Sequence, residues 1–300
     1  MHSLRRVAVA ACVIACAVPA AQVGGLAAAH ATPVTASTAA AHRPAAPAGV
    51  VAVAGDLVNA ASGKRMWSRG LNTRHPIASL TKVMTALVVL SDGHLNRKIK
   101  VTEAAIQYAA EHSAGNAGLH VGDVLTAWQL LEGMLLPSGA DAAYLLAHSY
   151  GPGWHAFVKA MNVKARKLGM TRTHFANFDG LPWPSPRATY STPRDLILLG
   201  EAAMKVAGFR QIVGQRRHRI AATRAHHRYV WTNTNLLLGQ YRGTIGIKTG
   251  YTTAAGYCLI FEAKRGGKEL MGVVLDSTNS NANMRFTSAR RLLTWGFAGG

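Results

Sequence analysis

The order of strand-like and helix-like segments is the feature that most constrains this fold. Residues 50–59 and 64–68 predict a hairpin around Ser62-Gly63, and residues 244–248, 256–263 and 269–275 predict three strands near the other end. Helical patterns fill the middle. Because the strands of the two ends need one another to bury a face, we expect a mixed α/β (α+β) protein. Its antiparallel sheet would be built from both termini, flanked by helices and joined by a helical lobe.

The middle of the chain shows apolar residues at helical spacing between glycines and prolines. A second hairpin, 217–222 with 228–232, interrupts this pattern. The predicted helices are 81–90, 124–135, 140–148, 155–168, 192–204 and, near the C-terminus, 284–295.

Residues 1–31 have the layout of a secretory signal peptide. Arg5 and Arg6 precede an apolar run, and Ala29-His30-Ala31 is a cleavage site of the small-x-small type, with residues 18–20 as an earlier candidate. The alternative is a lipoprotein site at Cys16. Residues 32–49, rich in Ala, Pro and Thr, predict a linker, which leaves residues 50–300 as one catalytic domain. We therefore expect an exported protein on the cell-wall side of a bacterial membrane.

The charge of the exported part points to an anionic partner. Residues 1–31 hold two of the 33 basic residues and none of the 13 acidic ones, so the rest of the chain keeps a net charge of +18. Such an excess favours polyanions. Outside the cytoplasm these are an anionic wall polymer or a membrane surface, and we expect no nucleic acid.

The sequence predicts neither a disulfide nor a metal or cofactor. Cys258 is the only cysteine after the apolar run, and its strand context is typical of a small buried residue. His218, His226 and His227 lie close together in a basic hairpin. Their spacing fits no common metal site, and no carboxylate or thiol is near them in sequence.

Ser79 and Lys82 form a Ser-x-x-Lys motif, the first of three short motifs that carry chemistry. Residues three apart share a helix face, so Lys82 can reach the Ser79 hydroxyl. Burial and a nearby cation, with Lys248 as the candidate, would lower the pKa of Lys82 until it can act as a base. Taken alone, the motif is also typical of an N-cap serine beside a lysine.

Ser138-Gly139-Ala140 and Lys248-Thr249-Gly250 are the other two motifs. Lys248-Thr249-Gly250 is predicted to end a strand, where Gly250 would let a substrate backbone approach. Lys248 and Thr249 would then face a carboxylate or a developing anion. The N–H groups of Tyr251 and Ser79 would donate to the oxyanion of an acyl-transfer transition state.

Together the three motifs are those of active-site serine penicillin-recognising enzymes. Residues 50–300 resemble the D-alanyl-D-alanine carboxypeptidases among the low-molecular-mass penicillin-binding proteins. The resemblance implies a β-lactamase/transpeptidase-like fold. It rests on residues 77–86, 135–143, 179–182, 190–196, 233–235, 246–252 and 292–297.

The resemblance also implies roles for individual residues. Ser79 would attack the penultimate D-alanine of a peptidoglycan stem peptide and Lys82 would take its proton. Ser138, supported by Lys248, would pass a proton to the leaving amine. Water would then hydrolyse the acyl-enzyme, and β-lactam antibiotics would acylate the same serine covalently.

Two further residues are assigned to the terminal carboxylate of the substrate. The resemblance implies that Thr249 and Arg285 bind it, with Gly250 and Tyr251 lining the substrate strand. Arg285 lies seven residues before Leu292 in the predicted last helix.

Ala140 departs from the family pattern, which has Asn at this position, and it puts substrate affinity and hydrolysis in question. A β-lactamase is a rival interpretation, but between Asp141 and Asp195 the only other acid is Asp179, and no Glu is present to activate water. A D,D-endopeptidase acting on cross-links would use the same chemistry. A catalytically weakened wall-binding protein is the alternative from another functional class.

Overall fold

The computed structural model describes residues 46–300. The predicted signal peptide, Cys16 and most of the predicted linker lie outside these residues. Within them, a five-stranded sheet runs in the order β2-β1-β11-β10-β9, and every neighbouring pair is antiparallel. The strands are β1 (Ala54–Asn59), β2 (Arg65–Arg69), β3 (His75–Pro76), β4 (Lys98–Lys100), β5 (Val124–Thr126), β6 (Tyr190–Ser191), β7 (Arg217–Ile220), β8 (Tyr229–Thr232), β9 (Thr244–Thr252), β10 (Gly256–Arg265) and β11 (Lys268–Leu275).

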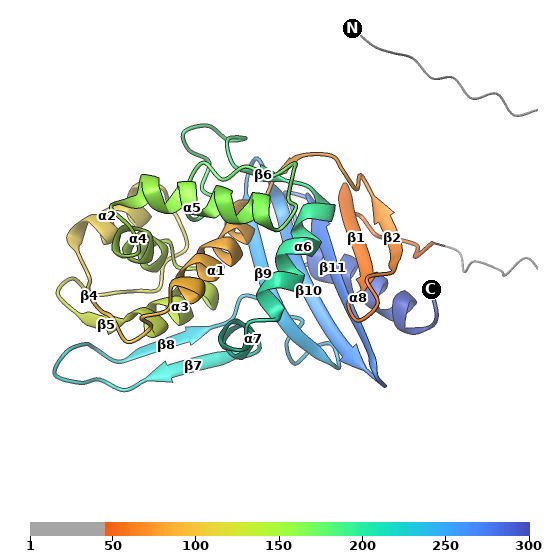
Figure 1. Ribbon diagram of the computed structural model, residues 1–300. Coiled ribbons are helices and arrows are strands. Elements are labelled where there is room, and N and C mark those ends of the chain that lie inside the picture. The colour runs from red at the N-terminus through yellow and green to blue at the C-terminus, as the bar shows by residue number, and fades with distance from the viewer. Residues whose placement is uncertain (1–45) are drawn as a thin grey trace, which may run out of the picture. The chain divides into compact units, whose positions relative to one another are not determined.

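The predicted sheet of both termini is therefore confirmed, with β1 pairing directly with β11. Most helices gather beside the β9 edge, where the β7–β8 hairpin also lies (Figure 1). The helices are the 3₁₀ turn η1 (Ala78–Thr81), α1 (Lys82–Asp92), α2 (Glu103–Glu111), α3 (Ala127–Leu135), α4 (Ala140–Ser149), α5 (Trp154–Lys167), α6 (Pro193–Met204), α7 (Ala207–Val213) and α8 (Met284–Phe297).

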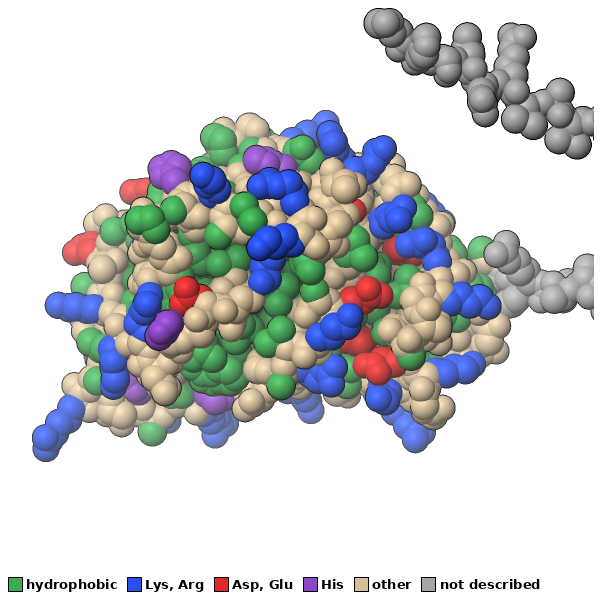
Figure 2. Space-filling view, in the orientation of Figure 1, with side chains coloured by type: hydrophobic (Ala, Val, Ile, Leu, Met, Phe, Trp, Pro, Cys, Tyr) green, Lys and Arg blue, Asp and Glu red, His purple; other side chains and the backbone are tan. Residues whose placement is uncertain are grey.

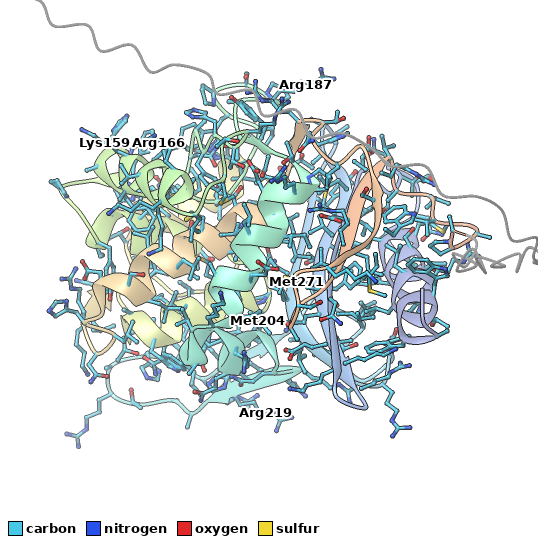
Figure 3. The ribbon with its side chains drawn as sticks, turned by 45° about the vertical axis from the view of Figure 1, so that its right-hand side comes forward. Lys159, Arg166, Arg187, Met204, Arg219 and Met271 are labelled. Carbon is cyan, nitrogen blue, oxygen red and sulfur yellow. The ribbon has the colours of Figure 1, made fainter. Side chains whose placement is uncertain are left out.

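Helices cover both faces of the sheet, α6 in front and α8 behind (Figure 1). Phe286 and Leu293 of α8 pack with Phe261 of β10 in a cluster of their own. On the other face, an added Cβ at Gly200 would stand 2.7 Å from the Met271 sulfur, so this glycine lets α6 approach β11 (Figure 3). Both faces of β10 and β11 are therefore buried.

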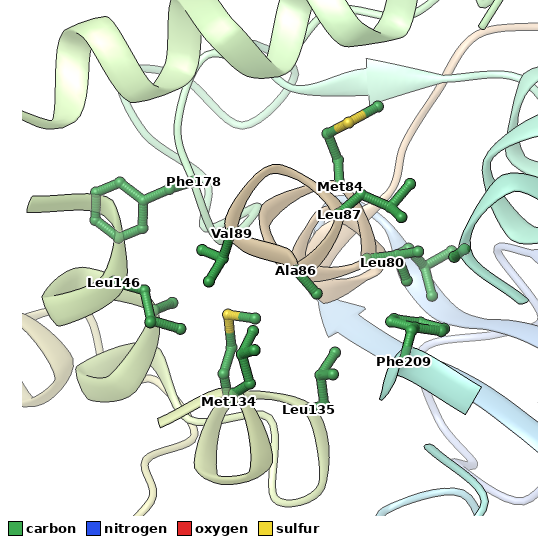
Figure 4. Close-up of a cluster of buried hydrophobic side chains, with 14 of the residues drawn as sticks. Leu80, Met84, Ala86, Leu87, Val89, Met134, Leu135, Leu146, Phe178 and Phe209 are labelled. Carbon is green, nitrogen blue, oxygen red and sulfur yellow. The ribbon is translucent and has the colours of Figure 1, made fainter. Parts of the chain in front are cut away.

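Helix α1 is the centre of the larger core. Its side chains Met84, Ala86 and Val89 are fully buried against Met134 of α3 and Leu146 of α4, among others (Figure 4). A helix that is apolar on nearly every side needs neighbours all round. Residues at the start of α1 are therefore held in place by several helices.

Two sequence predictions are wrong in detail. Residues 124–126 form β5 rather than the first turn of a helix, and Thr126 caps α3 through a capping box with Gln129. Strand β9 continues to Thr252, so Lys248-Thr249-Gly250 lies inside the strand and not at its end. The alternative interpretation of Ser79 as a helix cap does not hold, because the chain enters α1 through the 3₁₀ turn η1 and α1 has no side-chain cap. The helices α2 and α7 were not predicted.

The surface retains the basic character of the sequence. Lys and Arg side chains are spread over the face seen in Figure 2, with few Asp and Glu among them. Between residues 46 and 300, no helix has the length and apolar content needed to span a bilayer.

Replacing Leu146 by alanine tests the core around α1. Leu146 is fully buried, so we expect Leu146→Ala to lower the free energy of unfolding by about 3–5 kcal/mol, through lost apolar burial and the cavity left behind. Val121→Ala, at a site 55% exposed, is the control and should change it by less than about 0.5 kcal/mol. Urea unfolding followed by circular dichroism measures both. Equal effects would contradict this account of the core.

Candidate active site

Ser79 and Lys82 meet as the motif predicts. The Lys82 Nζ donates a hydrogen bond of 3.0 Å to the Ser79 Oγ. Ser79 lies within η1 and Lys82 is the first residue of α1, so the turn brings the two side chains to one side of the chain. Lys82 also lies 3.5 Å from the Asp179 carbonyl oxygen. A hydroxyl and an amine at this distance are suited to proton transfer.

These two residues line a cavity of about 480 Å³ between the β9 edge and the helices. Seven of the eight predicted site residues line it, as do Pro182, Thr234 and Thr252. The full lining is Ser79, Lys82, His112, Ser113, Ala114, Gly115, Pro137, Ser138, Leu181, Pro182, Thr234, Thr249, Gly250, Tyr251, Thr252, Thr253 and Arg285. Of the predicted residues, only Lys248 is not part of this lining.

Lys248 lies behind the cavity wall. Its side chain is 1% exposed, and its Nζ donates to the carbonyl oxygen of Thr249 at 3.0 Å. Burial lowers the pKa of Lys248 well below that of an ordinary lysine, and the charges of Lys82 and Arg285 lower it further. Lys248 is therefore placed to act on the site through its charge rather than by touching a substrate.

Burial also lowers the pKa of Lys82, while the carboxylates of Asp179 and Asp141 oppose the shift. Lys82 is 1% exposed, so its ammonium form loses almost all contact with water. We expected burial and the neighbouring Lys248 to lower this pKa together; burial is the main cause, and Lys248 is not among the others. The two carboxylates favour the charge on Lys82, and no carboxylate is among the causes acting on Lys248.

Each of these carboxylates is buried and satisfied by other groups. Asp179 accepts hydrogen bonds from the Tyr108 hydroxyl at 2.9 Å and the Leu181 N–H at 3.1 Å. Asp141 accepts from the N–H groups of Ala117 and Leu119, among others. Burial raises the pKa of both carboxyl groups, and the charge of Lys82 lowers it. Lysine and carboxylates thus stabilise one another's charged forms inside the protein.

The backbone before Ser79 is strained and enclosed by two glycines. Ala78 has a φ of +46°, which costs a non-glycine residue about 1–2 kcal/mol. A Cβ on Gly180 would lie 1.9 Å from the Ala78 carbonyl oxygen, and one on Gly250 would lie 3.0 Å from the Ile77 carbonyl oxygen. We expected Gly250 to make room for a substrate backbone, and it makes room for the nucleophile turn.

Ser138 reaches the cavity from the loop before α4. It too is in the left-handed region, with a φ of +69°. Ala140, two residues on, is fully buried and is not part of the cavity lining. The adjacent Asp141 faces the interior and holds the loop at Ala117. In this structure position 140 therefore does not present its side chain to the cavity.

The other end of the cavity collects groups suited to a carboxylate. The Thr249 Oγ1 lies 2.6 Å from the Thr234 Oγ1. Arg285 of α8 donates to the Gly250 carbonyl oxygen at 3.2 Å, and its Nε is buried without a partner. Its guanidinium lies 5.0 Å from the centre of the Tyr257 ring, on which Tyr251 stacks. An arginine with a free N–H donor is suited to an oxygen anion.

Sequence reasoning did not assign Thr234, His112 or Asp179 to the site. Thr234 and Asp179 lie in segments that carried the family resemblance, so a signal for them was present. The His112 ring packs at a tilted angle against Tyr108, the tyrosine that donates to Asp179, and no sequence pattern indicated His112. These contacts join residues far apart in sequence, and only the fold reveals them.

The histidines of the basic hairpin and Cys258, for which the sequence predicted no catalytic or metal-binding role, lie outside the catalytic cavity. The His218 Nε2 lies 3.2 Å from Glu132, whereas the His227 Nδ1 lies 2.9 Å from Asp123. No group of three or more His, Cys, Asp or Glu side chains suited to a metal ion occurs in residues 46–300. Cys258 is fully buried, and burial raises the pKa of its thiol to about 12. The thiol is therefore neutral at physiological pH.

Comparison with known proteins gives a consistent result. The family Peptidase S11, described as D-alanyl-D-alanine carboxypeptidase, matches residues 39–279. A D-alanyl-D-alanine carboxypeptidase from Streptomyces sp. strain K15 is 41% identical over 83% of this chain and 88% of its own. DacB2 from Mycobacterium tuberculosis, of the same description, is 37% identical over 79% of each chain.

A solved structure agrees with the fold. The crystal structure of the Streptomyces K15 DD-transpeptidase superposes with a TM-score of 0.78 at 40% identity, covering 83% of this chain and 98% of its own. The family match stops at residue 279, before α8. The place of Arg285 in the site therefore rests on the geometry described above.

The effect of Asp179 on Lys82 can be measured directly. Asp179→Asn removes a charge that favours the ammonium form, so we expect the pKa of Lys82 to fall further below that of an ordinary lysine. NMR titration of protein labelled at the lysine side chains measures the shift. Asp92→Asn removes an exposed carboxylate and should leave Lys82 unchanged. A Lys82 pKa that rises or stays constant in Asp179→Asn would refute the assignment.

Proposed function

The chain belongs to the D-alanyl-D-alanine carboxypeptidase family of serine peptidases, and on that premise we propose that Ser79 is its acylated nucleophile. The observation that carries the proposal is the 3.0 Å hydrogen bond between Ser79 and the buried Lys82. In its neutral form Lys82 takes the hydroxyl proton as Ser79 attacks the carbonyl of the penultimate D-alanine. The free D-alanine leaves as an amine, and the peptide remains as an ester on Ser79.

Ser138 is the residue that returns a proton to the leaving amine. It faces the same cavity as Ser79 and Lys82. Lys248 supports this step from behind the wall. Burial lowers its pKa, and a substrate carboxylate held near Thr249 would favour its charged form again.

The terminal carboxylate of the substrate is bound by Thr249, Thr234 and Arg285. The two threonine hydroxyls are within hydrogen-bond distance of each other, and the free Nε of Arg285 belongs to the same cavity. The N–H groups of Ser79 and Tyr251 form the oxyanion hole. Because β9 is the outermost strand of its sheet, the substrate peptide lies along it as an added strand.

Hydrolysis of the acyl-enzyme distinguishes this protein from a β-lactamase. Of the residues described, those that line the cavity include no Asp or Glu. Asp179 and Asp141 are buried outside this lining and accept hydrogen bonds from other groups. A β-lactam acyl-enzyme at Ser79 therefore meets no carboxylate in the cavity wall that could activate water, and it would persist. This is the behaviour of a penicillin-binding enzyme that the antibiotic inhibits.

Cleavage of cross-links is the second candidate activity. A relative from Escherichia coli named D-alanyl-D-alanine endopeptidase is 32% identical over 80% of this chain. An endopeptidase releases a peptide amine in place of free D-alanine, and the same residues around Ser79 would catalyse this reaction. Product analysis with a cross-linked muropeptide dimer separates the two activities.

The partners and location follow from charge and layout. We propose that residues 1–31 direct export, that residues 32–49 form a linker, and that residues 50–300 act at the cell wall. The basic surface would hold the enzyme near an anionic wall polymer or membrane surface, where stem peptides are abundant (Figure 2).

Release of D-alanine from an acyl-L-Lys-D-Ala-D-Ala peptide tests the proposed nucleophile. Ser79→Ala should lower the rate by about 10⁴-fold or more and abolish covalent labelling by fluorescent penicillin, because no acyl-enzyme can form. Ser68→Ala, on the exposed strand β2, should retain both activities. Labelling of a folded Ser79→Ala protein would place the nucleophile elsewhere.

The pH dependence of penicillin acylation tests Lys82 as the base. Because the neutral amine accepts the proton, the rate constant should rise about tenfold per pH unit and level off at the Lys82 pKa, below the ordinary lysine value of 10.5. Stopped-flow measurement of labelling gives this profile. Lys82→Arg should lose the rise together with most of the rate. A profile that keeps rising to pH 10.5 would contradict the depressed pKa.

A further inference from the structure

A second cavity, of about 680 Å³, lies where β8 leads towards β9. It is larger than the cavity at Ser79 and shares no lining residue with it. Figure 1 shows the β7–β8 hairpin and α7 on this side of the protein. The lining is Arg216, Arg217, Thr232, Asn233, Asn235, Leu236, Leu238 and Gln240.

The charge of this lining is positive and uncompensated. Arg216 and Arg217 contribute two guanidinium groups, and no Asp or Glu is among the described residues that line the cavity. Neither arginine forms an ion pair within residues 46–300. The Arg216 guanidinium packs closely against Gly239, where an added Cβ would stand 2.8 Å from it. One of the two charges is therefore held at the cavity by packing.

Asn235, in the lining of the second cavity, has a buried side-chain N–H donor that no acceptor pairs with. Its Oδ1 accepts from the Leu237 N–H at 3.2 Å, which fixes the orientation of the amide. Its backbone N–H donates to the Asn233 Oδ1 at 2.9 Å. The residue is 1% exposed, and its Nδ2 has no hydrogen-bond partner. Buried donors are nearly always paired, so an unpaired one beside two guanidinium groups points to an absent acceptor.

The second cavity and the catalytic cavity lie on opposite sides of one short segment. Thr234 lines the catalytic cavity and contacts Thr249, whereas its neighbours Asn233 and Asn235 line the second cavity. The chain bends at Thr234, so this side chain and those of its two neighbours face different cavities. The Asn233 Nδ2 donates to the Val213 and Gln215 carbonyl oxygens and so anchors the segment.

We propose that the second cavity binds an oxygen anion, a phosphate or carboxylate group carried by an anionic wall polymer. Arg216 and Arg217 would pair with the charge, and one oxygen would supply the acceptor that the Asn235 Nδ2 lacks. Leu236 and Leu238 offer an apolar wall to the carbon skeleton of the polymer. This inference rests on the proposed anionic partner and gives that partner a defined site.

The first experiment measures binding of inorganic phosphate and of acetate to the full-length protein by NMR, with asparagine side-chain amides labelled. We expect the Asn235 amide signal to shift on saturation. Arg216→Ala/Arg217→Ala should weaken binding about tenfold or more. Asn235→Asp, which replaces the free donor by an acceptor of the same shape, should weaken it similarly.

The matched control is Arg219→Ala/Arg224→Ala, which removes two exposed charges from the same hairpin outside the cavity. Arg219 is labelled in Figure 3. It should bind phosphate as the unmodified protein does. Equal weakening by both pairs of substitutions would show that phosphate senses only the diffuse surface charge, and it would overturn the proposal. An Asn235 signal that does not move at saturation would overturn it too.

The second experiment compares the two sources of the anion and separates the cavity from catalysis. Retention on immobilised glycerol-phosphate oligomer or glucuronate oligomer, at physiological salt, identifies the phosphate or the carboxylate polymer as the ligand. The cavity variant should lose retention and keep penicillin labelling of Ser79, because neither arginine lines the catalytic cavity. Equal retention of the cavity and control variants would refute the second cavity as the binding site, but it would leave the proposed anionic partner unaffected. If Ser79 were not the nucleophile, penicillin labelling of Ser79 would be absent from the unmodified protein as well, whereas its retention on the oligomers would be unaffected.

Discussion

Burial of two lysine side chains is the constraint on which the rest of this structure depends. Lys82 and Lys248 are each 1% exposed, and a charged ammonium group in such an interior is costly unless opposite charge lies near it. Asp179 and Asp141 supply that charge for Lys82 from two separate segments. The loop before α6, helix α4 and the start of α1 must therefore meet at one place, which draws the helices together at the β9 edge.

Close approach of backbones makes this meeting possible. Gly180 and Gly250 contact the turn that carries Ser79 from two sides, and no larger residue fits at the first without moving that turn. The same packing holds Ala78 at a positive φ, a conformation that an isolated chain would leave. The rest of the fold thus stabilises the strained turn, and the Ser79 hydroxyl is oriented towards Lys82 before any substrate arrives.

Local patterns were enough to predict the sheet, most helices and the Ser79–Lys82 pair, because strand alternation and helical spacing involve near neighbours. They were not enough for contacts set by the fold. The strand pattern placed Lys248 at a strand end facing the substrate, yet β9 continues to Thr252 and Lys248 lies behind the cavity wall. Thr234 contacts Thr249, which lies 15 residues further along the chain, and nothing in its own segment indicates that partner.

The segment of residues 233–235 links the two cavities physically. Thr234 contacts Thr249 on one side, and Asn235 faces the basic cavity on the other. Anchoring of Asn233 to Val213 and Gln215 leaves the segment little freedom to move independently. A group bound at Asn235 would therefore act on the same anchored segment that holds Thr234 beside Thr249. Because linkage is reciprocal, any factor by which that group changes the affinity for a peptide at Thr249 would equal the factor by which the peptide changes the affinity of the basic cavity.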